Sequence, residues 1–322
     1  MTSEVEERIH KALSSHPLER IDQGYRLVHQ GGAGVSTLRL LPVEPGANGP
    51  NAVAIAQIVA EYNPARIPSF HAAAVQRLNA MAVHGAYHTE NGNLRQTAQF
   101  SIHTNEPAVH LAVQTILNAF GGQLPIGMSV ALATASAAAL EQQRAHHAMP
   151  RQWQTPVDPE SLNAATKMLR DRGLVASNDA KSVWAELPLS GDCPSRSIDP
   201  QAETAVIQVD TTIPHPVAGA GYLATISLPP AVPAADSAEV CRRLNALELQ
   251  ATDFVPRLGA WGLHGPDAVP GYSCFMPCAE PYAGMHMTMI WWSAIRAAWL
   301  RDRVWVAKRG LTLEALGTNK PG

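Results

Sequence analysis

Two short motifs occur twice in this chain, and they constrain its architecture more than any other feature. The tetrapeptide Arg-Leu-Asn-Ala occupies residues 77–80 and 243–246, and a Gly-Ala-aromatic triplet occupies residues 85–87 and 259–261. Each tetrapeptide lies in a segment with the apolar spacing of a helix, and each triplet begins a segment that alternates like a strand. Motifs that recur in the same order predict two copies of one structural unit.

The apolar pattern predicts the same order of elements in both copies, namely helix, three strands, helix, two strands and helix. In the first copy we expect these elements at residues 4–14, 25–29, 36–43, 52–62, 69–81, 85–88, 94–103 and 107–120. In the second copy we expect them at 159–172, 183–189, 205–212, 222–228, 237–249, 258–263, 272–276 and 285–306. Short turns between successive strands favour antiparallel pairing. The predicted fold is therefore α+β, with two tandem copies of an α-β-β-β-α-β-β-α module. Each copy is an antiparallel five-stranded sheet with three helices, and together they form a pseudo-dimer.

The length of 322 residues suits two domains of ordinary size. We expect a first module at 1–150, which carries an additional Ala-rich helix at 127–147, and a second module at 151–322. Asn91-Gly92 is a strong signal for a hairpin turn in the first module. Gly265-Pro266-Asp267 is the corresponding turn in the second.

Composition and charge exclude several classes of partner. A hydrophobic fraction of 46% and a charged fraction of 16% are typical of a folded globular protein. The net charge of −3 offers no basic surface for phosphates, so nucleic acid is not an expected partner. The acidic start lacks a secretory pattern, which predicts a cytoplasmic protein. The apolar stretches 124–140 and 285–300 are shorter than the ~20 residues of a spanning helix, so no membrane insertion is expected.

The four cysteines do not form a recognised metal or thiol motif. They are Cys193, Cys241, Cys274 and Cys278. The last two, with His264 and His286, come closest to a metal or nucleophile site, but three residues separate them where a zinc knuckle has two. Buried, inert thiols are the favoured interpretation, and no metal or cofactor is expected.

Other chemical signals are equally weak. The Gly-rich stretch 31–34 lacks the Lys-Ser/Thr of a phosphate loop and precedes a strand, which favours a hairpin turn. His84, His88, His103 and His110 are interpreted as hairpin and helix positions, because no nucleophile and base set accompanies them. The sequence therefore predicts that the protein is not an enzyme.

Aromatic residues supply the candidate binding surface. Four tryptophans crowd the last expected helix, at positions 291, 292, 299 and 305. They cover more than one helix face, so we expect some in the core and others at a contact between the halves or with a partner. The candidate partner-binding residues are Phe254, Trp261, Trp292 and Trp299.

The two repeated motifs also carry a resemblance to a known family. A helix ending in Leu-Asn (78–79 and 244–245), a Gly-Ala-aromatic strand start and the turn at 91–92 resemble the YbjN family and the type III secretion chaperone-like fold. The resemblance implies a binding module without a cofactor. Such chaperones act as homodimers that wrap an extended client, so a tandem chain looks like both subunits fused into a monomeric pseudo-dimer. The chain departs from this pattern in an insertion before Gly259, a long loop at 193–200 and the Ala-rich helix.

We therefore hypothesise a non-enzymatic protein-binding module, chaperone-like or adaptor, that holds a partner polypeptide in secretion, envelope assembly or stress regulation. One alternative is a small-molecule-sensing or enzymatic protein that uses a cleft between the halves, with Cys274, Cys278 or the histidines as working groups. Another is a structural subunit of an envelope or secretion assembly.

Overall fold

A computed structural model shows two antiparallel sheets with helices packed on them. It describes residues 3–14, 18–28, 34–43, 52–63, 72–80, 82, 85–103, 157–189, 203–215, 219–229, 233, 235–250, 257–277, 285–305, 313 and 316. Four sequence expectations lie outside the described residues. They are the helices at 107–120 and 127–147, the module boundary at 150 and the turn residues 31–33.

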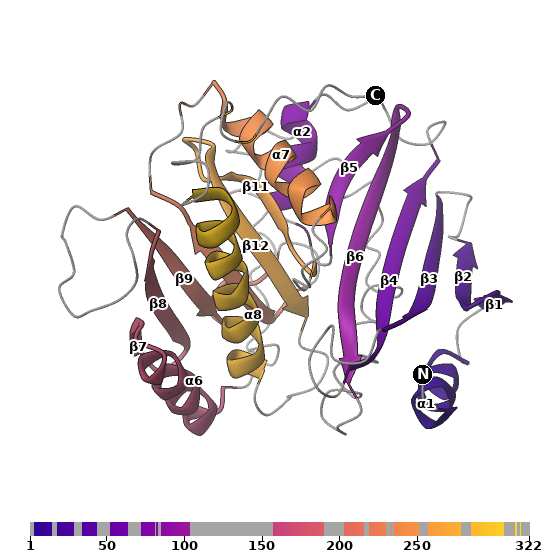
Figure 1. Ribbon diagram of the computed structural model, residues 1–322, viewed down its shortest axis with the longest axis horizontal. Helices are drawn as coiled ribbons and strands as arrows, with labels where there is room; N and C mark the ends of the chain where they lie inside the picture. Colours follow the sequence, from indigo (N-terminus) through magenta and orange to yellow (C-terminus); the bar gives the residue numbers. More distant parts are fainter. Residues whose placement is uncertain are drawn as a thin grey trace.

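The first half forms a six-stranded sheet in the spatial order β1-β2-β3-β4-β6-β5 (Figure 1). All neighbouring strands are antiparallel. Helix α2 (Ala72–Ala80) connects β4 to β5, and α1 (Ser3–Leu13) precedes β1. The strands are β1 Leu18–Ile21, β2 Gly24–Val28, β3 Gly34–Pro42, β4 Ala52–Tyr62, β5 Ala86–Glu90 and β6 Asn93–His103.

The second half repeats this strand order. Its sheet runs β7-β8-β9-β10-β12-β11, again antiparallel throughout. The strands are β7 Val175–Asn178, β8 Ser182–Pro188, β9 Thr204–Asp210, β10 Gly221–Ser227, β11 Ala260–His264 and β12 Val269–Pro277. The helices are α6 Pro159–Asp171, α7 Ser237–Gln250 and α8 Met285–Leu300, and a π-helical turn η3 (Arg301–Trp305) continues α8. The α+β class is confirmed.

The predicted count of five strands per sheet is wrong, because each sheet has six. The additional strand is the first one in both halves, β1 and β7, so the order up to the second hairpin is α-β-β-β-β-α-β-β. Each of these strands has only four residues, Leu-Glu-Arg-Ile and Val-Ala-Ser-Asn. Such short edge strands show no clear alternation of apolar and polar residues, which is why the pattern did not reveal them.

The two expected hairpins are confirmed. Glu90 pairs with Asn93 across Asn91 and Gly92, whose φ angles are 52° and 79°. Two successive positive φ angles are what a tight two-residue hairpin turn requires, and Asn-Gly adopts them readily. In the second half, His264 pairs with Val269 around Gly265.

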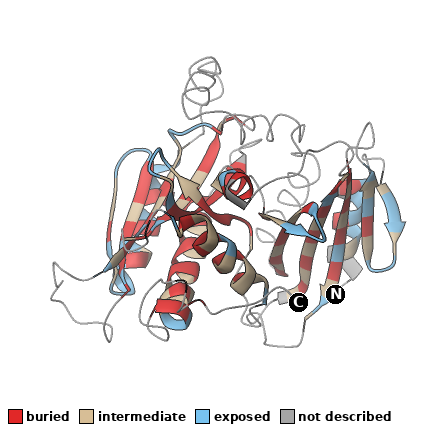
Figure 2. Ribbon diagram, turned by 90° about the horizontal axis from the view of Figure 1, so that it is seen from above, coloured by how far each residue is buried: buried red, intermediate tan, exposed pale blue. Residues whose placement is uncertain are grey.

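Helices α6 and α8 cover one face of the second sheet (Figure 1). Along β8, Val183, Ala185 and Leu187 are buried while Glu186 between them is exposed, as expected for a sheet covered on one side. Figure 2 shows the buried residues concentrated along the strands and the helix faces turned toward them. One hydrophobic cluster contains buried side chains from both halves, so the two sheets share a core.

Helix α2 of the first half packs on the second sheet, against β11 and β12. Ala260 and Gly262 point to the face that meets α2, since Ser273, opposite Ala260, donates to the backbone carbonyls of Asn79 and Ala80 at 3.3 and 3.2 Å. Helix α8 lies on the opposite face, because its Arg296 contacts Tyr272. A Cβ at Gly262 would lie 2.7 Å from the Gln76 carbonyl oxygen and closer still to the Ala80 nitrogen. The missing side chain therefore allows the helix to approach.

Replacement of Gly262 by Val tests this approach. The new side chain meets helix backbone, which cannot move aside locally, so we expect the free energy of unfolding to fall by about 2–3 kcal/mol. Gly265→Asn is the matched control, because nothing lies within 4 Å of a Cβ at Gly265 and asparagine tolerates its positive φ of 67°. Urea unfolding of both variants measures the difference. Equal stability of Gly262→Val and the unchanged chain would contradict the close α2–β11 contact.

Candidate functional site

The repeated asparagine has the same role in both halves. The Asn79 side chain accepts from the Tyr87 backbone N–H at 2.6 Å and donates to the Tyr87 carbonyl at 3.0 Å. Asn245 makes the same pair of bonds with Trp261, at 2.9 and 2.8 Å. Each amide thus pairs with an edge strand as a neighbouring strand would. The outward-facing backbone groups of Tyr87 and Trp261 are therefore unavailable to an added strand.

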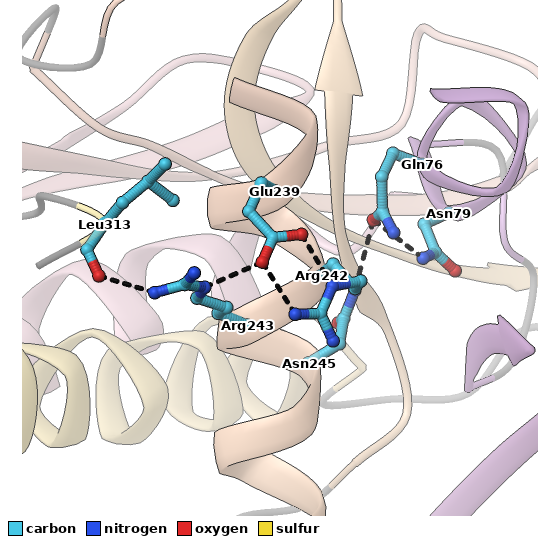
Figure 3. Close-up of polar contacts among 7 residues, drawn as sticks. All are labelled: Gln76, Asn79, Glu239, Arg242, Arg243, Asn245 and Leu313. Carbon is cyan, nitrogen blue, oxygen red and sulfur yellow. Dashed lines mark hydrogen bonds and ion pairs between the residues drawn. The ribbon is translucent and has the colours of Figure 1, made fainter. Parts of the chain in front are cut away.

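A single glutamine joins the two asparagines (Figure 3). Gln76 Oε1 accepts from Asn79 Nδ2 at 3.1 Å and from Asn245 Nδ2 at 3.4 Å, and all three side chains are buried. The edge strands also approach each other here, because Ala86 of β5 and Ala260 of β11 belong to one small apolar cluster. Gly85 N–H donates to the Leu258 carbonyl at 2.8 Å across the same junction.

The exposed side of α7 holds an ion-pair cluster, also seen in Figure 3. Glu239 accepts from Arg242 at 2.6 Å and from Arg243 at 2.8 Å, and Arg243 also donates to the Leu313 carbonyl. Hydrogen bonds from Arg242 and Arg243 lower the pKa of Glu239 to about 2, although burial opposes this. The cluster fixes the chain at Leu313 beside α7.

A second polar network is buried inside the second half. Arg296 of α8 donates to both oxygens of Glu248 on α7, at 2.8 and 3.1 Å, and to the Tyr272 hydroxyl at 2.5 Å. Trp261 Nε1 donates to Glu248 at 2.7 Å, and the Arg296 guanidinium lies 3.9 Å from the Tyr272 ring centre. Burial lowers the pKa of Arg296, but the Glu248 carboxylate raises it, and the net direction is upward. The charged pair links α7, α8, β11 and β12.

The described cysteines and histidines do not form a reactive centre. Cys241 and Cys274 are buried, and burial raises the pKa of each thiol to about 12. Both are therefore protonated at neutral pH and poor nucleophiles. Within the described ranges, no group of three or more His, Cys, Asp or Glu residues is arranged to hold a metal. Cys193, Cys278, His84 and His110, and the side chain of His103, lie outside what the structure describes.

One side of α8 carries large apolar side chains that pack partly against the core and stay partly exposed. Trp291, Trp292, Ile295 and Trp299, which we call the α8 stripe, are all half-buried, whereas Arg296 and the residues facing the sheet are buried. Their spacing places them on one arc of the helix. The Arg172 guanidinium lies 4.5 Å from the centre of the Trp291 ring at one end of the stripe.

The predicted partner-binding residues are thus separated by the fold. Trp292 and Trp299 belong to the α8 stripe, while Trp261 is 0% exposed inside the Glu248 network and has no surface to offer a partner. Phe254 lies outside the described residues. Trp305, also noted from the sequence, is buried and donates to Glu203 at 2.6 Å.

The buried ion pair was missed from the sequence, although a signal for it existed. Arg296 is the only Asp, Glu, Lys or Arg in the mostly apolar α8, and a charge in such a helix needs a partner when the helix is buried. The partner, Glu248, lies far away in sequence, so no local pattern identified it. The half-exposed position of Trp291 and its contact with Arg172 also went unrecognised.

Replacement of Arg296 by Met tests the buried ion pair. It leaves the Glu248 carboxylate buried without its cation, so we expect a loss of about 3–5 kcal/mol in the free energy of unfolding. The double variant Arg296→Met with Glu248→Met should regain much of this loss, because no lone charge is left. Arg242→Met serves as control and should cost within about 1 kcal/mol, since its ion pair with Glu239 is half exposed. A small effect of Arg296→Met alone in urea unfolding would argue against the network.

Stability should also fall in mildly acidic solution. Desolvation lowers the pKa of His88, His264 and His286 below the ordinary value of 6.5. The unfolded chain then binds protons more readily, so stability is complete above about pH 6.5 and declines as pH falls below it. Glu239 adds a separate loss only below about pH 4.5, because its pKa is lowered to about 2.

Urea unfolding at pH 7.5 and 5.5 measures this dependence. His286 is the residue to replace first, because it is buried and its Nε2 has no hydrogen-bond partner among the described residues. His286→Phe should therefore reduce the difference between the two pH values. Greater stability at pH 5.5 than at pH 7.5 would show that the sign is wrong.

Comparison with known protein families, curated proteins and solved structures finds no match for this chain. The proposal for its function therefore rests on the junction, the buried network and the α8 stripe.

Proposed function

We propose that this chain is a non-enzymatic protein-binding module, chaperone-like or adaptor, that holds a partner polypeptide on the α8 stripe. The observation that carries the proposal is the row of half-buried tryptophans and Ile295 on the outer arc of α8, which has no charged residue. A surface helix normally turns charged or polar residues toward water. A contiguous apolar surface with several tryptophans is instead typical of a protein-interaction site.

The closed edge strands support binding at a helix rather than at a sheet edge. Asn79 and Asn245 pair with β5 and β11, and α2 covers β11. At the opposite edge of the second sheet, Arg170 Nε donates to the Ala176 carbonyl of β7 at 2.8 Å. Backbone groups at Tyr87, Trp261 and Ala176 are therefore already bonded and unavailable for strand addition.

Tandem duplication is part of the same proposal. We infer that the modules 1–150 and 151–322 are copies of one unit and form a pseudo-dimer, as the resemblance to the YbjN and type III secretion chaperone-like fold implies. The shared strand order supports this inference. So do the equivalent bonds of Asn79 to Tyr87 and of Asn245 to Trp261, which join the two repeated motifs in each half.

The alternative of a sensor or enzyme with a cleft between the halves has less support. The junction side chains Gln76, Asn79 and Asn245 are buried and bonded to one another. The pKa of Cys274, the described thiol named for that alternative, is raised to about 12 by burial.

Within the described residues, no helix is long and apolar enough to cross a membrane.

Photo-crosslinking tests the proposed function. Benzoylphenylalanine at position 292 or 299 preserves a large aromatic side chain in the stripe, and the same residue at Val28, which is 56% exposed on β2, is the control. We expect adducts with another polypeptide from positions 292 and 299 in cells, identified by mass spectrometry, and none from position 28. Equal labelling at all three positions, or no adduct at 292 and 299, would contradict binding at the stripe.

A further inference from the structure

The α8 stripe has no counterpart in the sequence of the first half. The segment expected to correspond to α8, residues 107–120, reads Pro-Ala-Val-His-Leu-Ala-Val-Gln-Thr-Ile-Leu-Asn-Ala-Phe. It contains no tryptophan, whereas α8 contains three. A homodimer would have two equivalent surfaces, but this chain carries the tryptophan-rich one only once.

The junction between the halves is also unequal. Gly262 faces Gly271 across β11 and β12; α2 packs over Gly262, and the His264 ring lies over Gly271. By the register of the repeated Gly-Ala-aromatic motif, the equivalent pair in the first sheet is His88 opposite Arg95. Arg95 is fixed there by ion pairs with Glu61 and Glu90. These larger side chains occupy the place that a helix would need.

The difference also shows in the helices. Among the described elements, α7 makes no extensive contact with β5, although α2 packs closely on β11. The repeat position of Gln76 in α2 is taken by Arg242 in α7, whose side chain is 45% exposed and paired with Glu239. The first half thus supplies a helix to the second sheet, and among the described elements α7 makes no comparable contact with the first sheet.

Charge at the stripe indicates the chemistry of its partner. Arg172 is exposed, stacks on Trp291 and forms no ion pair within the described part of the chain. Its Nη1 also donates to the Met168 carbonyl at 3.1 Å. The guanidinium is therefore placed to receive a carboxylate at the edge of an apolar contact.

The shape of the stripe favours a helical partner. From Trp291 to Trp299 it extends about 12 Å along α8, at 1.5 Å per residue. Helix α6 packs against α8, and its last turn reaches Trp291 at one end of the stripe, so α8 already packs against one helix beside this surface. A partner helix with apolar residues at i, i+4 and i+7 presents a matching ridge.

We propose that each chain docks one amphipathic helix on the α8 stripe, with a carboxylate at the end of the helix that lies beside Arg172. This inference rests on the proposed function and adds the partner's shape, its charge and the stoichiometry of one per chain.

Three synthetic helical peptides of about 14 residues, or roughly four turns, test it. The first has leucines along one face and a glutamate at each end, the second replaces both glutamates by lysine, and the third has the composition of the first with the leucines distributed around the helix. Fluorescence anisotropy with the full-length chain measures affinity, and isothermal titration calorimetry measures stoichiometry. We expect the first peptide to bind once per chain and the third to bind about tenfold more weakly.

A charge reversal at Arg172 distinguishes a direct contact between Arg172 and the peptide from attraction by the overall charge of the chain. Arg172→Glu should lower the affinity for the glutamate peptide by about threefold and raise the affinity for the lysine peptide by a similar factor. Lys11→Glu, an equal change of charge at an exposed position of α1, should leave both affinities unchanged. Two peptides per chain, equal binding of the third peptide, or equal effects of both substitutions would overturn the inference. If no peptide binds although positions 292 and 299 crosslink, the helical partner is wrong and the proposed function stands; if both experiments are negative, both fail.

Discussion

The contact between α2 and the β11–β12 surface is the interaction on which the rest of the structure depends. It requires the absence of a side chain at Gly262, because the helix backbone lies where a Cβ would be. Once α2 is in place, Gln76 reaches both Asn79 and Asn245, and Ser273 bonds to the end of the helix. A single glycine in β11 thus allows α2 to pack closely enough to join the two sheets.

Buried contacts on both sides of this region also limit which surfaces remain for the proposed partner. The asparagines saturate the outward backbone groups of Tyr87 and Trp261, so the inner edge of each sheet is closed at these positions. Arg296 and Glu248 hold α8 and α7 to the sheet from within. Because α8 is fixed on its inner side, its outer tryptophans are held half-exposed at a defined position. Binding of the proposed partner would therefore cost little side-chain conformational entropy.

Much of the fold was predictable from local pattern, and the errors have physical causes. The Arg-Leu-Asn-Ala and Gly-Ala-aromatic repeats predicted two similar units. The turn residues at 91–92 and 265–267 predicted both hairpins, since turn chemistry and apolar spacing act over a few residues. Strands β1 and β7 were missed because four-residue edge strands are too short to show an alternation of apolar and polar residues. The sequence placed Trp261 among partner-binding residues, since an aromatic residue on an edge strand has the same pattern whether it is covered or open. The contacts that cover it come from Glu248 on α7 and Tyr272 on β12, which the pattern of its own strand does not reveal.

Unfolding of the two halves provides the most direct test of the central claim, that α2 makes them one cooperative unit. All seven tryptophans follow residue 150, so tryptophan fluorescence reports the second half, while far-ultraviolet circular dichroism reports both. The account predicts a single urea transition with the same midpoint by both probes. It also predicts that Asn79→Ala, a change in the first half, lowers the fluorescence midpoint and the dichroism midpoint together. Two separate transitions, with a fluorescence midpoint that Asn79→Ala leaves unchanged, would contradict it.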